Sequence, residues 1–217
     1  MFRRLFSWWK EDILLKRALE QSAEAIDRAG RIFSVAMDVA TRGQGTQENV
    51  YEMDKTLNTA QIEIRKKVLE HLTINPEQDV TASLVLITII VDVERVGDLA
   101  KNIVELPGLA RAVLDRPEYA GDLGTMRERL ESAISRTRDA FVEADAAAAE
   151  QVMETLTWVA NRCDAMLQAV AGDESLGVRR AVAYCLLFRF IRRISLHTRN
   201  VASSVVNPFH KLGYKPD

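Results

Sequence analysis

Residues 84–107 decide the fold, and they read LVLITIIVDVERVGDLAKNIVELP. The first half is apolar and rich in β-branched residues, so by itself it would also suit a buried strand. In the second half, acidic and amide residues recur every three or four positions, and small or apolar residues form a second stripe. This is the periodicity of a helix with two different faces, and Pro107 provides a stop. We therefore predict a core helix that ends near Pro107.

Two carboxylates lie one turn apart on this predicted helix. Glu94 and Asp98 are spaced i and i+4, so their side chains share a face and could offer oxygens to one cation. The alternative is that both are solvated surface charges beside Arg95 and Lys101. Gly97 lies between the two acids, where glycine costs a helix about 1 kcal/mol against alanine. That cost indicates the close approach of another helix, which would bring the acids toward an interior.

The sequence around these acids resembles the signature of the PhoU family. Residues 92–105, DVERVGDLAKNIVE, are similar to the family pattern Leu-Glu-Arg-Ile-Gly-Asp-His-Ala-x-Asn-Ile-Ala-Glu, with Leu99 where the family often has histidine. Residues 53–58, MDKTLN, resemble a second element of the family, Asp-x-x-x-Asp, with Asn58 in place of the second acid. The resemblance in layout covers the whole chain, but the specific motif lies in its first half.

The resemblance implies a metal site in the first half of the chain. The residues that match the family's ligands are three acids, joined by two amides as weaker oxygen ligands: Asp54, Glu94, Asp98, Asn58 and Asn102. An all-oxygen set suits Mg, Ca or Mn on chemical grounds. The resemblance also admits iron or zinc, so the identity of the metal stays open among Fe, Zn, Mg and Mn.

Composition is that of an ordinary globular domain. The chain has 217 residues, of which 28% are charged and 47% hydrophobic, and only 10 Gly and 5 Pro are available for turns. This favours a few long helices. Two cysteines without disulfide or zinc spacing predict a reducing cytosol. The longest uncharged run, residues 80–91, is too short for a bilayer and no signal peptide is visible, so we expect a cytoplasmic protein.

The chain as a whole reads as six long helices in two tandem three-helix bundles, an all-α, PhoU-like fold. The predicted helices cover residues 10–41, 47–73, the segment already described, 124–144, 146–170 and 176–206. Residues 106–121 are the longest weakly patterned stretch. We place the boundary there, with a first repeat at 1–107 and a second, degenerate repeat at 108–217.

The two halves also repeat in sequence. When Glu94 is aligned with Arg192, the helix at 84–107 matches the last helix in several places: Arg95 with Arg193, Val96 with Ile194, Lys101 with Arg199, Asn102 with Asn200 and Ile103 with Val201. Asp98, however, falls on Leu196. The second repeat therefore lacks the carboxylates of the first, and we expect no cation at the equivalent place.

The last helix and the N-terminus are basic. Four arginines fall on one broad face of the last helix: Arg189, Arg192, Arg193 and Arg199. One hypothesis is an acidic partner or anionic lipid, and the alternative is pairing with acids such as Glu143, Glu150 or Glu154. Trp8 and Trp9 lie among basic residues and would either touch a membrane or cap the first bundle. No recognisable nucleic-acid module is present.

No catalytic set is visible, so we predict a protein that is not an enzyme. There is no Glu-x-x-His pair for a di-metal centre, no Ser/His/Asp set and no glycine-rich phosphate loop. Resemblance to the PhoU family implies a regulatory adaptor that controls phosphate uptake and signalling through a membrane transporter and a sensor kinase. The resemblance also implies a homodimer, and the basic last helix and N-terminus predict a peripheral place at the inner face of the membrane. The alternatives are an accessory subunit of another carrier, such as a sodium–phosphate symporter, and a metal-dependent helical-bundle enzyme.

Overall fold

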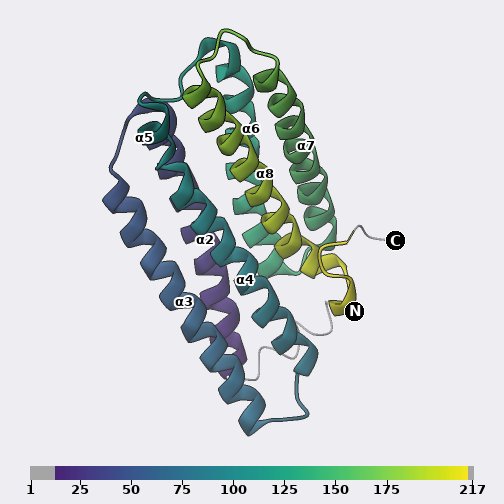
Figure 1. The fold of residues 1–217 in the computed structure, drawn as a ribbon. Helices are drawn as coiled ribbons and strands as arrows, with labels where there is room; N and C mark the ends of the chain where they lie inside the picture. The colour runs from purple at the N-terminus through teal and green to yellow at the C-terminus, as the bar shows by residue number, and fades with distance from the viewer. Residues whose placement is uncertain (1–12, 215–217) are drawn as a thin grey trace.

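A computed structural model describes residues 13–214, and this part of the chain is built from helices (Figure 1). Six long helices are joined by short connections and accompanied by two short ones. They are α2 (Ile13–Arg42), α3 (Gln47–Ile74), α4 (Val80–Ile103), α5 (Leu106–Ala110), α6 (Pro117–Glu143), α7 (Ala146–Ala171), α8 (Val178–Val206) and the 3-10 helix η1 (Phe209–Lys211). The all-α prediction is confirmed.

The helices form two three-helix bundles that lie side by side. Helices α2, α3 and α4 pack against one another, and so do α6, α7 and α8. The bundles are joined along their length, because α4 packs against α8 and α2 packs against α6 (Figure 1). The short helix α5 contacts chiefly α8. The proposed division of the chain after residue 107 falls within α5 and stays a prediction.

Apolar stripes supply the core of each bundle. The stripe of α2 includes the fully buried side chains of Leu15, Ile32 and Phe33. They share one face of the helix because apolar residues recur every three or four positions, as predicted. In the second bundle the equivalent interior holds the aromatic rings of Tyr184 and Phe188 on α8. One continuous hydrophobic core therefore runs through both bundles.

The helix ends follow from local chemistry. The side chain of Thr46 accepts a hydrogen bond from the backbone N–H of Asn49 and caps α3, and Asp145 caps α7 in the same way. Between α2 and α3 the backbone turns through Gly43 and Gly45, both with positive φ (65° and 94°). Glycine occupies this conformation without steric cost, so the tight connection needs it.

The segment between the bundles is more helical than the sequence analysis predicted. Helix α4 ends at Ile103, and Pro107 is not its stop, because it lies in the first turn of α5 instead. Helix α6 begins at Pro117, whereas we had predicted residue 124, so Tyr119 and Leu123 become part of the core. Proline suits the first turn of a helix, and burial of these two side chains outweighs the poor helix propensity of the nearby glycines.

Within residues 13–214, no helix is both long and apolar enough to cross a membrane.

Candidate functional site

The predicted carboxylates lie beside a point at which α3 and α4 pack tightly against each other. Gly97 makes this approach possible, because a Cβ at that position would lie 2.5 Å from Leu57 Cδ2 and 3.5 Å from Asp54 Oδ1. Leu57 and Asp54 are both buried on α3. The close approach inferred from Gly97 is therefore confirmed, and it places Asp54 beside the turn of α4 that carries Glu94 and Asp98.

A lysine joins the acids of the two helices. The Nζ atom of Lys101 lies 3.0 Å from Asp54 Oδ2 and 2.9 Å from Asp98 Oδ1. Asp54 Oδ2 also accepts a hydrogen bond from the amide of Asn58, at 3.3 Å. Burial alone would lower the pKa of Lys101, but hydrogen bonds and charge from Asp98 and Asp54 raise it above its usual value. The lysine is therefore a fixed positive charge between two carboxylates.

Glu94 lies one turn before Asp98 on α4 and is the third acid of this cluster. Its side chain is only 17% exposed, and its nearest cation is Arg95, whose Nε lies 3.7 Å away. Burial raises the pKa of Glu94; Arg95 opposes this effect, whereas the charges of Asp98 and Asp54 add to it. The 3.7 Å contact of Glu94 with Arg95 is also longer than the contacts of Asp54 and Asp98 with Lys101. Asn102, the remaining predicted ligand, is half-buried one residue beyond Lys101.

The observed side chains do not fit the predicted metal site as they stand. The Lys101 ammonium occupies the point where Asp54 and Asp98 meet. Over residues 13–214, no group of three acidic, histidine or cysteine side chains is placed to hold a metal ion. Metal binding by Asp54, Glu94 and Asp98 stays a prediction. We had noted Lys101 only as a neighbouring charge, although its position three residues after Asp98 was a signal that it could reach that acid.

The equivalent place in the second bundle has lost the acids of α4 and keeps basic residues. Arg192, aligned with Glu94, donates from Nε to Asp164 on α7, 2.9 Å away. Arg199, aligned with Lys101, donates to the carbonyl oxygen of Gly213 at 3.0 Å. The alternative of intramolecular pairing thus holds for Arg192, but the partner is Asp164 and not one of the glutamates considered from the sequence.

The predicted arginine face of α8 divides into two kinds of residue. Arg192 and Arg199 are half-buried and satisfied within the molecule, as described above. Arg189 and Arg193 are exposed, and within the described residues we find no ion pair for either. Trp8 and Trp9, the other predicted contact residues, lie outside the described residues. The face available to a partner is therefore narrower than the sequence indicated.

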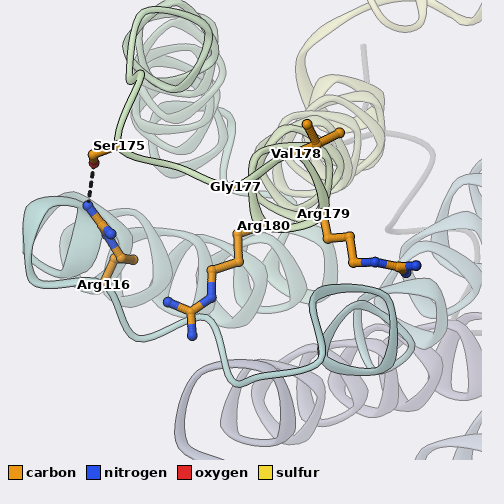
Figure 2. Close-up of a pocket in the computed structure, with 6 residues that line it drawn as sticks. All are labelled: Arg116, Ser175, Gly177, Val178, Arg179 and Arg180. Atoms are coloured by element: carbon orange, nitrogen blue, oxygen red, sulfur yellow. Dashed lines mark hydrogen bonds between the residues drawn. The ribbon is translucent and has the colours of Figure 1, made fainter.

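The structure also contains a second basic feature, which is formed by two separate parts of the chain and was not predicted from the sequence. Figure 2 shows an open hollow lined by Arg116, Ser175, Arg179 and Arg180 at the start of α8. Arg116 is committed to neighbours there, because its Nη2 donates to Ser175 Oγ at 2.9 Å and its Nε pairs with Glu118 at 3.1 Å. No sequence signal joins residues this far apart along the chain.

Comparison with known proteins identifies related chains. Residues 15–106 match the family model described as "PhoU domain". Over 189 residues the chain is 23% identical to the "Phosphate-specific transport system accessory protein PhoU homolog" of Aquifex aeolicus, which covers 82% of this chain and 85% of that protein.

Two solved structures share the fold. PhoU from Pseudomonas aeruginosa superposes with a TM-score of 0.79 at 18% identity, covering 89% of this chain and 95% of that one. The phosphate transport system regulatory protein PhoU from Streptococcus pneumoniae gives a TM-score of 0.78 at 15% identity, with 88% and 93% covered. The likeness extends over both bundles, well beyond the region that the family model matches.

Proposed function

We propose that the protein is a regulator of phosphate transport, because residues 15–106 match the family model described as "PhoU domain". The observation that carries the proposal is this domain, together with the accessory protein of a phosphate-specific transport system that is similar over most of the chain. In this role the protein acts as an adaptor at the cytoplasmic face of the membrane. It controls uptake and phosphate-responsive signalling by contact with a membrane transporter and a sensor kinase.

The exposed arginines of α8 supply a contact surface for such an adaptor. Arg189 and Arg193 are exposed on the same helix as Arg192 and Arg199, which are hydrogen-bonded within the molecule. Two unpaired guanidinium groups one turn apart favour binding to an acidic surface. At physiological salt this attraction is largely screened beyond a Debye length of about 8 Å. We assign this surface to the transporter, with the N-terminal basic and aromatic residues as a second, apolar contact.

Deletion of the gene tests the regulatory role directly. We expect phosphate uptake and a phosphate-responsive reporter to escape repression when phosphate is abundant, and the full-length chain to restore both. Unchanged uptake and reporter activity in the deletion strain would contradict the role in phosphate transport. A defect confined to a different ion would instead support the alternative of an accessory subunit for another carrier.

Charge reversal tests the surface separately from the role. The variant Arg189→Glu/Arg193→Glu should lose co-purification with the transporter and should fail to restore repression. The matched control is Arg65→Glu/Lys66→Glu, which makes the same change in net charge on exposed residues of α3. Equal co-purification of both variants at low salt would remove α8 from the contact. Binding to protein-free anionic vesicles, lost only in the α8 variant, would assign the surface to lipid.

Light scattering of the purified chain tests the predicted homodimer.

A further inference from the structure

We infer that the Lys101 ammonium is the resident cation of the acidic cluster between α3 and α4 (Asp54, Glu94 and Asp98), in the place where these acids would otherwise hold a divalent metal ion. The chemistry of this acidic cluster is independent of the proposed function. It differs from the expectation that the family resemblance created, in which the same acids are metal ligands.

The geometry is that of an occupied cation site. Lys101 donates to one carboxylate from each helix, at 3.0 Å to Asp54 and 2.9 Å to Asp98. An ammonium group has three donors and no acceptor, so these two contacts use most of its hydrogen-bonding capacity. The Asp54 side chain is 6% exposed and the Lys101 side chain 23%, which makes the contact largely shielded from solvent. The lysine thus neutralises the one acid that is buried between the helices.

Removal of the ammonium would leave a set of oxygens without a counter-charge. Asp54 Oδ1 is buried and has no hydrogen-bond partner, and it faces the position of Gly97. Glu94 and Asp98 lie nearby on α4, and the charges of Asp54 and Asp98 both act on Glu94. A divalent ion has to displace Lys101 or lie beside it against like-charge repulsion, since a unit charge at this distance is felt strongly in a shielded site. Lys101 therefore competes with a metal ion for the same oxygens.

The second bundle keeps the basic residue although it has lost the acids. Arg199 is aligned with Lys101, and it donates to the carbonyl of Gly213 and to Thr157 Oγ1. A basic side chain at this position thus fixes the last turns of α4 and of α8 to neighbouring segments. The shared arrangement supports a structural use of the position, with the cation provided by the chain itself.

The test is a calorimetric titration with Mn²⁺, which measures its affinity for the full-length wild type and for Lys101→Met. Methionine keeps the length of the side chain and removes its charge. We expect Lys101→Met to bind Mn²⁺ at least tenfold more tightly than wild type, and the gain to disappear in Lys101→Met/Asp98→Asn. Equal affinity in wild type and Lys101→Met would overturn the inference. So would a folded Lys101→Met variant that binds no Mn²⁺.

A second measurement uses the wild-type chain, in case loss of Lys101 impairs folding. The ammonium proton signals of Lys101 are observed by NMR and assigned by their loss in Lys101→Arg. We expect them to be protected from rapid exchange and unchanged by millimolar Mg²⁺, since the ammonium already fills the site. Displacement of these signals by Mg²⁺ would show that the metal is the preferred cation and would overturn the inference.

Discussion

At the scale of single residues, Gly97 decides how closely α3 and α4 approach. A Cβ there would lie 2.5 Å from Leu57 Cδ2, and Leu57 is fully buried. The sequence signal was the cost of glycine inside a helix, and the structure shows what that cost permits. Because Asp54 lies beside the same point of contact, the residue that sets the helix distance also sets the distance between the acid on α3 and the ammonium on α4.

The variant Gly97→Ala is expected to destabilise the protein. Alanine favours the helix by about 1 kcal/mol, but overpacking a filled core costs about 1–3 kcal/mol, so the net loss of stability is at most about 2 kcal/mol and the helix gain is cancelled. The matched control is Gly121→Ala in α6, where a Cβ would meet nothing within 4 Å and the helix gain of about 1 kcal/mol should appear alone. Urea unfolding of both variants measures the difference. A Gly97→Ala variant as stable as Gly121→Ala would show that Leu57 yields without cost.

At the scale of elements, one arginine joins the first helix of each bundle. Arg127 on α6 donates to Asp38 Oδ1 on α2 at 2.7 Å, to Glu131 at 2.9 Å and to the hydroxyl of Ser34 at 3.2 Å. Its side chain is 12% exposed, so these contacts are mostly shielded from solvent. The hydrogen bond from Arg127 holds the pKa of Asp38 below its usual value, against the opposing effect of burial. The interface between α2 and α6 is thus specified by polar groups as well as by apolar contact.

The variant Asp38→Asn is expected to lose about 1–3 kcal/mol at neutral pH, as for other hydrogen bonds to charged groups. Because the folded pKa is lowered, the contribution is present above the unfolded pKa of about 4 and is lost as pH falls through the folded value. The difference between wild type and Asp38→Asn should therefore shrink in acid. Denaturant unfolding at neutral and acidic pH measures it.

The control for this prediction lies on the same pair of helices. Asp27 on α2 pairs with Arg138 on α6 at 3.4 Å, but both side chains are more than a third exposed (36% and 37%). Asp27→Asn should cost less than about 1 kcal/mol, because solvent screens such pairs. A loss in Asp38→Asn that is as small, or that stays constant in acid, would mean that Arg127 contributes no more than a surface contact.

At the scale of the whole molecule, the two bundles behave as one packed body. Packing of α4 against α8 includes a half-buried polar cluster, in which Asp92 Oδ1 lies 2.7 Å from His197 Nδ1 and accepts a hydrogen bond from Asn200 at 3.1 Å. The backbone N–H of Leu114 also donates to the carbonyl of Ala40, which ties the segment between the bundles back to α2. Neither bundle can separate without exposing these groups and the apolar faces around them.

We therefore expect both bundles to unfold in a single transition. The variant Trp8→Phe/Trp9→Phe keeps Trp158 on α7 as the remaining tryptophan, so its fluorescence reports the second bundle. Circular dichroism reports all helices. The two urea curves should coincide, as they do for a cooperative two-state protein. A fluorescence midpoint clearly displaced from that of circular dichroism would show that the bundles unfold independently.

The sequence by itself determined the six long helices and the all-α class of the fold. Apolar periodicity is a local property of the sequence, and in any helical bundle the burial of an apolar stripe stabilises the helix that carries it. The sequence similarity between the helix at 84–107 and the last helix likewise predicted two bundles, and the replacement of Glu94 by Arg192 predicted that their chemistry differs. Only the tertiary structure decided which charges meet. Lys101 and Asp54 are 47 residues apart and Arg192 and Asp164 are 28 apart, so no local pattern predicts these pairs. Ion pairs depend on distances set by helix packing, and here packing gives the acids of the first bundle a lysine as their cation.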